Sequence, residues 1–222
     1  GFDAIGFPFE VESEISSSAA AGDLDGDGDK ELVFGAQDGT LYVLNKNGTE
    51  YLNYVQPDPI IDFPALNDLD NSGSLKIIFI AGNDTSSTLY VINNAGDNVT
   101  GFPVTIPERI VSGPAVADID GSGTADIVIV TLDSNVYAID VYGSLKSGFP
   151  FLTSDGIQTP ATLADLDGDQ DLEIITGNEG GNVYVLHHDG SIMASIITGH
   201  PIRGGVSIAD LDRNGQMELL FS

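Results

Sequence analysis

Cysteine and tryptophan are absent from the 222 residues, and basic residues are scarce. Without cysteine the chain has no disulfide bonds and no thiolate ligands for a structural zinc ion. Seven Lys and Arg stand against 34 Asp and Glu, and the net charge of -27 would repel nucleic acids and anionic lipids. No stretch approaches the roughly 18 consecutive apolar residues that a membrane span needs. We therefore expect no nucleic-acid partner and no direct membrane insertion.

An acidic nine-residue segment recurs five times without gaps. We name these segments loops 1 to 5: Asp23–Glu31, Asp68–Lys76, Asp118–Asp126, Asp165–Glu173 and Asp210–Glu218. Their first residues are 45, 50, 47 and 45 positions apart. The triplet Gly-Phe-Pro at 6, 101 and 148 precedes the first Asp of a loop by 17 residues each time, and Gly199-His-Pro201 is an altered copy. A period of this length indicates a repeat architecture.

Each repeat has the pattern of short strands joined by turns. Apolar runs too short for helices follow the loops, and alternating stretches with a regularly placed tyrosine come after them, at 41–44, 89–92, 136–139 and 183–186. Small residues precede the loops, as at the crowded centre of a radial fold. Four strands in each repeat predict an all-β fold, a β-propeller of four-stranded blades, with a β-solenoid as the main alternative.

Acidic residues at alternate positions of a tight loop supply the oxygen ligands that calcium prefers. In this interpretation the side chains at positions 1, 3, 5 and 9 and the carbonyl at position 7 bind the ion. Four carboxylates this close would otherwise repel one another. The flanking strands and the residues at position 12 exclude an EF-hand. Loops 1 and 4 fit best, with Asp23, Asp25, Asp27, Asp29 and Glu31 in one and Asp165, Asp167, Asp169, Asp171 and Glu173 in the other.

The other three loops depart from this set. We expect weaker calcium binding in loop 3, through Asp118, Asp120, Ser122, Thr124 and Asp126, and in loop 5, through Asp210, Asp212, Asn214, Gln216 and Glu218. In loop 2, Lys76 takes position 9 and its ammonium could pair with the aspartates, so we predict that this loop is empty. Gln170 replaces a glycine found in the other loops. His187 and His188 are candidates for a metal site, but we favour a solvated turn.

These loops, the Gly-Phe-Pro triplets and strands such as Leu41-Tyr-Val-Leu44 resemble the FG-GAP or VCBS type of propeller repeat, which also forms the heads of integrin α-subunits. The resemblance covers nearly the whole chain. It implies a blade whose calcium loop joins the innermost strand to the second. It also implies an extracellular or cell-surface protein that acts in adhesion or ligand binding and carries further domains.

The repeats divide the chain into blades at 15–62, 63–110, 111–157 and 158–202, with a partial fifth blade at 203–222. Residues 1–14 carry Gly-Phe-Pro and are expected to form the outer strand of a neighbouring blade. We therefore expect a partial ring, from a propeller of roughly six to eight blades.

The favoured function is a non-enzymatic module for adhesion, ligand recognition or scaffolding, with an extracellular protein or glycan as ligand. Saturation of weak sites by extracellular calcium favours an exported protein. Part of a secreted polysaccharide-degrading enzyme is one alternative, although no catalytic motif is visible. A carbohydrate-binding lectin is another. Asn47, Asn83 and Asn98 begin sequons for glycosylation.

Overall fold

The computed structural model describes the protein at residues 6–15, 17–215 and 217–222. These residues form strands, turns and irregular segments, and none of them belongs to a helix. Accordingly, the described part of the chain has no helix with the length and hydropathy needed to cross a membrane.

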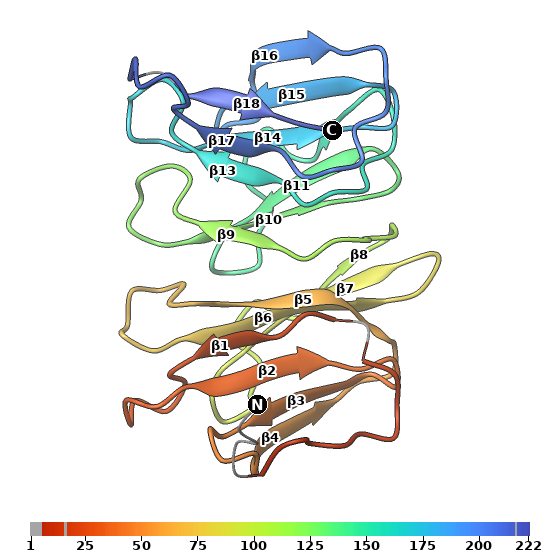
Figure 1. Cartoon of the computed structure of the whole chain (residues 1–222), viewed down its shortest axis with the longest axis vertical. Coiled ribbons are helices and arrows are strands. Elements are labelled where there is room, and N and C mark those ends of the chain that lie inside the picture. The colour runs from red at the N-terminus through yellow and green to blue at the C-terminus, as the bar shows by residue number, and fades with distance from the viewer. Residues whose placement is uncertain (1–5, 16, 216) are drawn as a thin grey trace. The chain divides into compact units, whose positions relative to one another are not determined.

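The chain divides into two compact units, Gly1–Arg109 and Ile110–Ser222. In the first unit, two four-stranded antiparallel sheets have the orders β1-β2-β3-β4 and β5-β6-β7-β8 (Figure 1). Their strands are β1 (Ala20–Gly22), β2 (Glu31–Gly35), β3 (Thr40–Leu44), β4 (Glu50–Val55), β5 (Ile60–Asn67), β6 (Lys76–Gly82), β7 (Ser87–Ile92) and β8 (Val104–Ile106).

The second unit repeats this design. Its two four-stranded sheets have the orders β9-β10-β11-β12 and β13-β14-β15-β16, and β17 and β18 form a two-stranded sheet. The strands are β9 (Ala115–Ala117), β10 (Asp126–Val130), β11 (Asn135–Ile139), β12 (Phe151–Leu152), β13 (Thr162–Ala164), β14 (Glu173–Gly177), β15 (Asn182–Leu186), β16 (Ile192–Ile197), β17 (Ser207–Ala209) and β18 (Glu218–Leu220). Each sheet is a meander of sequential strands, and each of loops 1 to 5 joins the first strand of a sheet to the second.

The second strand of each complete sheet is almost wholly buried. Every residue of β6, β10 and β14 is buried, although neighbouring side chains of a strand point to opposite faces. Burial on both faces explains why these strands are continuous apolar runs in the sequence. The runs are rich in Ile and Val, whose branched side chains suit a pleated surface.

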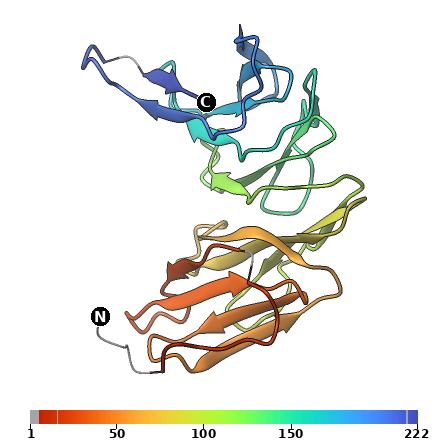
Figure 2. The same ribbon diagram turned by 45° about the vertical axis from the view of Figure 1, so that its right-hand side comes forward.

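Neighbouring sheets pack face to face within each unit. In the first unit, Val33 and Val43 of one sheet share a core with Ile77 and Phe79 of the next. In the second unit, alternate residues of β14 serve two cores. Ile174 packs toward the sheet of β10, and Ile175 packs with Val206 and Leu219 of the β17–β18 region, which lies beside this sheet in Figures 1 and 2.

The tyrosines that recur in the repeat contact aromatic rings of their own sheet or of the neighbouring one. Tyr42 stacks on Phe34 with ring centroids 5.4 Å apart, and Tyr90 stacks on Phe79 at 4.9 Å. Tyr184 meets Phe151 edge to face at 5.7 Å. Such pairs contribute roughly 0.5–1.5 kcal/mol beyond the burial of their area.

The glycine of the Gly-Phe-Pro triplet allows one repeat to touch the hairpin turn of the next. A Cβ on Gly148 would lie 1.8 Å from the carbonyl oxygen of Asp189, in the turn between β15 and β16. A Cβ on Gly6 would lie 1.7 Å from the equivalent oxygen of Asn47, between β3 and β4. Because no real Cβ atom tolerates such a distance, glycine is required here. The triplet's recurrence therefore has a packing cause.

Two predicted features at the edges of the blades differ in detail. The second sheet begins earlier than the predicted boundary at 63, because β5 starts at Ile60 and reaches full length through an irregularity between Ile61 and Ala65, where Asp62 has φ 52°. Of the predicted outer strand at 1–14, residues 6–14 are described and none is in a strand. In later repeats the residues that follow Gly-Phe-Pro form β8 and β12, and each of these strands pairs with the third strand of its own sheet.

Candidate metal centre

The first aspartate of each loop organises the loop backbone. In loop 1, Gly26 N donates to Asp23 Oδ1 at 2.8 Å and Gly28 N donates to Asp23 Oδ2 at 3.0 Å. In loop 4, Gly168 N and Gln170 N donate to the two oxygens of Asp165 at 2.6 and 3.2 Å. In loops 2, 3 and 5 the amide of position 5 replaces that of position 4 as the donor to Oδ1, and the amide of position 6 again donates to Oδ2 of Asp68, Asp118 and Asp210. In all five loops the first aspartate therefore accepts two backbone hydrogen bonds from its own loop.

The loop backbone requires left-handed conformations that favour glycine. Gly168 has φ 85°, and Gln170 keeps the same path with φ 82°. A non-glycine residue in this region costs of order 1–3 kcal/mol. Gln170 therefore replaces the glycine of the other loops without a change in the sign of φ.

The acidic residue at position 9 is buried and fixed by the second residue of its loop. Leu24 N donates to Glu31 Oε2 at 2.8 Å, and Leu166 N donates to Glu173 Oε2 at 2.7 Å. Glu31 is 2% exposed and Glu173 is 0% exposed. Burial, followed by repulsion from the aspartates of its loop, raises the pKa of Glu31. A cation bound beside this carboxylate would relieve both effects.

The carboxylates at positions 1, 3 and 5 converge in loops 1 and 4. Asp23, Asp25 and Asp27 each offer an oxygen atom, and these atoms lie within 4.8 Å of one another. Asp165, Asp167 and Asp169 form the same cluster, with ligand atoms within the same limit. The structure therefore brings together the side chains predicted at these positions, and oxygen-rich clusters of this kind suit Ca²⁺.

The aspartates at position 7 each contact a basic residue in the hairpin turn after the third strand. Lys46 pairs with Asp29, and His188 Nδ1 lies 3.1 Å from Asp171 Oδ2. The role of their backbone carbonyls as ligands stays a prediction.

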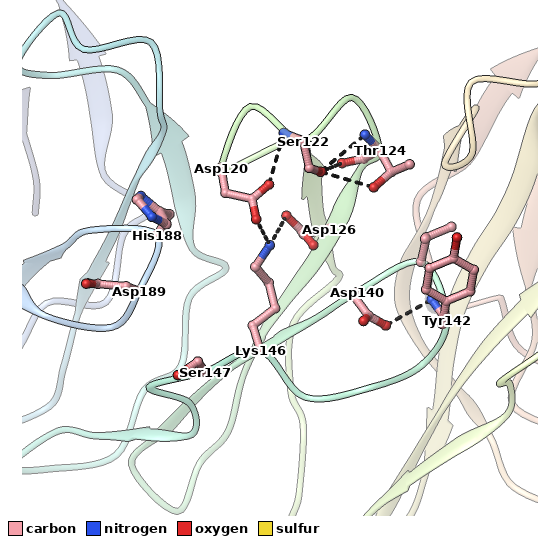
Figure 3. A pocket seen from close by; sticks show the side chains of 11 residues that line it. Asp120, Ser122, Thr124, Asp126, Asp140, Tyr142, Lys146, Ser147, His188 and Asp189 are labelled. Carbon is pink, nitrogen blue, oxygen red and sulfur yellow. Dashed lines mark hydrogen bonds and ion pairs between the residues drawn. The ribbon is translucent and has the colours of Figure 1, made fainter.

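Loop 3 holds an ammonium group among its carboxylates, where the sequence predicted a calcium ion. Lys146 Nζ donates to Asp120 Oδ2 at 2.6 Å and to Asp126 Oδ2 at 2.8 Å, and the Lys146 side chain is only 14% exposed (Figure 3). Ser122 and Thr124 make hydrogen bonds with each other at the rim of a pocket of about 430 Å³. Lys146 lies 28 residues beyond the start of its loop, so that loop spacing could not reveal it.

The two carboxyl groups that contact Lys146 have pKa values shifted in opposite directions. Burial would raise the pKa of Asp120, but hydrogen bonds from Lys146 and Ser122 lower it to about 2. At Asp126, which is 2% exposed, burial outweighs the same lysine and the pKa is raised. The pKa of Lys146 itself is raised by the two carboxylates despite its own burial. The lysine thus offsets one of the three carboxylate charges of loop 3, where ligand atoms of Asp118, Asp120 and Asp126 lie within 4.8 Å of one another.

Loop 2 also holds a lysine ammonium group beside its aspartates. The predicted pairing of Lys76 with an aspartate is present, because its Nζ donates to Asp70 Oδ1 at 3.3 Å and to the carbonyl of Ser74 at 2.9 Å. The Ser72 side chain, and after it Lys76, hold the pKa of Asp70 at about 2. A bound cation would have to displace this ammonium.

Loop 5 keeps the carboxylate cluster without a lysine contact among its described residues. The ligand atoms of Asp210, Asp212 and Glu218 lie within 4.8 Å of one another. Leu211 N donates to Glu218 Oε2 at 2.7 Å, and Asn214 donates to Asp212 at 3.0 Å. The predicted carbonyl ligand of Gln216 lies outside the described residues.

His187 lies beside loop 4, although the sequence favoured a solvated turn over a metal site for the two histidines. Its Nδ1 atom lies 3.3 Å from Glu173 Oε1, and the imidazole joins Asp167 and Glu173 in a group whose ligand atoms lie within 4.8 Å of one another. The solvated turn predicted for the two histidines is incomplete as a description. The antiparallel pairing of β14 with β15 brings this turn beside loop 4.

These meander sheets with an acidic loop after the first strand define a protein of the β-propeller class, and solved structures agree. Bap1, a biofilm matrix protein of V. cholerae, has a TM-score of 0.65 and 17% identity over 100% of this chain and 37% of its own. Sqt1 of Saccharomyces cerevisiae has a TM-score of 0.68 and 14% identity over 93% of this chain and 56% of its own. BBS1N, solved in complex with ARL6DN, has a TM-score of 0.64 and 14% identity over 89% of this chain and 59% of its own.

Two family models identify the repeats. The FG-GAP repeat matches residues 16–51, and the FG-GAP-like repeat matches residues 146–221. The chain belongs to the FG-GAP repeat proteins. No curated protein sequence matches it. The chain spans less than two thirds of the solved structures named above.

Proposed function

We propose that this chain is a calcium-stabilised propeller module of an extracellular or cell-surface protein, in which it acts in adhesion, ligand recognition or scaffolding without catalysis. The observation that carries the proposal is the convergence of three aspartates in loops 1 and 4 beside a buried glutamate. FG-GAP repeats commonly occur in extracellular proteins, and their propeller domains are generally non-catalytic. The likeness to Bap1, a biofilm matrix protein, is compatible with an adhesive role.

The loops differ in the cation that we propose for each of them. Loops 1, 4 and 5 take Ca²⁺, whereas the ammonium groups of Lys76 and Lys146 take its place in loops 2 and 3. This proposal narrows the expectation from sequence, which counted loop 3 among the calcium sites. Either cation relieves the repulsion among carboxylates that would otherwise open the loop between two strands.

Chelation tests the proposal. Metal that binds only the folded state adds RT ln(1 + [L]/Kd) to the free energy of unfolding, which is about 2.7 kcal/mol for one site at a hundred times Kd. We therefore expect the melting temperature to fall when calcium is replaced by a chelator. Asp165→Ala should reduce the calcium effect, and the matched variant Asp68→Ala, in a lysine-containing loop, should leave it unchanged. A melt that is indifferent to chelator would refute structural calcium.

The adhesion role needs its own test, because stability says nothing about ligands. Binding of the purified chain to extracellular matrix proteins and to a glycan array, with and without calcium, separates the recognition of proteins from that of sugars. Calcium-dependent binding to either class would support recognition. Turnover of a polysaccharide by the chain would refute the non-catalytic part of the proposal.

A further inference from the structure

Loop 4 contains a buried acceptor that the protein itself does not satisfy. Glu173 is 0% exposed, and its Oε2 atom accepts the hydrogen bond from Leu166 N. Its other oxygen, Oε1, is buried and has no hydrogen-bond partner. A buried acceptor left unpaired costs about 1–3 kcal/mol, and more when it is charged. Such an atom calls for a positive partner, which is either a protonated His187 or a bound cation.

The group that Oε1 faces is an imidazole. His187 Nδ1 lies 3.3 Å away, and the His187 side chain is 32% exposed, so that an ion from solvent can reach it. Two ligands held about 2.1 Å from a zinc-sized ion at the tetrahedral angle are about 3.4 Å apart. The observed separation therefore lets one small ion bind both atoms. Asp167 provides a third ligand within 4.8 Å of both.

We propose that Asp167, Glu173 and His187 form a site for a first-row divalent transition metal, such as Zn²⁺ or Mn²⁺. Imidazole nitrogen is a preferred ligand of these ions, whereas Ca²⁺ takes oxygen ligands almost exclusively. The inference rests on the proposed function in one respect, since it takes loop 4 to be a divalent cation site. It adds a nitrogen ligand from outside the loop and a different class of metal.

Loop 1 provides a control within the same chain. It has the same acidic residues at positions 1, 3, 5, 7 and 9, but the residue equivalent to His187 is Asn45. The amide nitrogen of Asn45 donates to Thr49 at 3.0 and 3.2 Å within its own turn. Loop 1 therefore lacks the nitrogen ligand, and we expect it to keep the ordinary calcium preference.

Pulsed electron paramagnetic resonance of bound Mn²⁺ tests the site without any variant. In the 222-residue protein loaded with about one equivalent of Mn²⁺, we expect a ¹⁴N coupling from a directly bound imidazole. The coupling should vanish in His187→Asn, which copies loop 1, and persist in His188→Asn. A spectrum with no nitrogen coupling, or one lost only in His188→Asn, would overturn the proposal.

Calorimetric titration with Zn²⁺ and with Ca²⁺ supplies the second measurement. Loss of an outer-shell partner weakens a metal site by roughly 10–100-fold, and loss of a direct ligand should weaken Zn²⁺ binding by at least about tenfold. Calcium affinity should change much less in His187→Asn. If calcium binds but zinc affinity is unchanged, the transition-metal inference is wrong while the proposed function stands. If neither ion binds loop 1 or loop 4, the proposed function fails as well.

Discussion

Replacing Gly148 by alanine tests whether the Gly-Phe-Pro triplet is a packing contact between successive blades. Gly148 has φ 87°, and a Cβ there would lie 1.8 Å from the carbonyl oxygen of Asp189. Gly199, in the altered triplet Gly-His-Pro, is the matched control, because it has φ 76° with nothing within 4 Å of its Cβ position. Both variants carry the conformational penalty, but Gly148→Ala alone carries the clash.

The magnitudes follow from these two differences. A left-handed conformation costs alanine about 1–2 kcal/mol. The smaller conformational entropy of the unfolded chain returns about 0.4–1 kcal/mol. Gly199→Ala should therefore lose about 1 kcal/mol. The forced displacement of the turn adds about 1–3 kcal/mol, so that Gly148→Ala should lose about 3 kcal/mol.

Urea unfolding and thermal unfolding, both followed by circular dichroism, measure the loss of stability in the two variants. For a chain of this length each kcal/mol corresponds to about 2–4 °C in melting temperature, which makes the predicted difference easy to resolve. Equal losses in the two variants would refute the reasoning, because they would show that the contact with Asp189 adds nothing. A crystal structure of Gly148→Ala should show the β15–β16 turn displaced.

Three further predictions concern the loops. Gln170→Gly should stabilise the protein by about 1 kcal/mol in urea unfolding, because φ 82° is strained for glutamine, and a loss of stability would contradict this. Lys146→Met should destabilise the calcium-free protein by about 3 kcal/mol, because the charge of Asp126 is left buried without its ion pair. Added calcium should restore much of that loss. If calcium does not change the stability of the variant, the role given to the ammonium group is refuted. Burial raises the pKa of Glu31, so on acidification the folded protein takes up this proton before the unfolded chain does, and the calcium-free protein should gain stability as the pH falls from neutral toward the ordinary pKa of a glutamate. If a Glu31→Gln variant keeps the full gain in stability on acidification, another group causes that gain. Asp70 and Asp120 have a pKa of about 2, so their contributions to the free energy of unfolding should be lost only below about pH 4.

Much of the fold was predictable because the acidic loop recurs five times in the sequence. The runs that became β6, β10 and β14 are apolar at nearly every position, and this pattern indicates strands that are buried on both faces. The loops were predictable because their ligands are local in sequence. The aspartates at positions 1, 3 and 5 converge through backbone hydrogen bonds inside nine residues, as spacing alone suggested.

Two basic groups that contact the loops from outside were not predictable in the same way. Lys146 and His187 belong to the turn region after the third strand of a sheet, more than 20 residues beyond the start of their loops. Antiparallel pairing of the second and third strands carries that turn back to the loop. The pairing fixes which turn returns, but the reach of each side chain depends on its local geometry. The loop motif alone therefore could not show that an ammonium group lies among the carboxylates of loop 3.

The claim that tight acidic corners are neutralised by bound ions in some loops and by lysine in others is tested most directly by locating calcium. Anomalous X-ray diffraction from crystals grown with calcium chloride should show ions in loops 1, 4 and 5, with the ammonium groups of Lys76 and Lys146 remaining in loops 2 and 3. Loops 1 and 4 without an ion, or calcium in loop 2 beside an unmoved Lys76, would contradict the account.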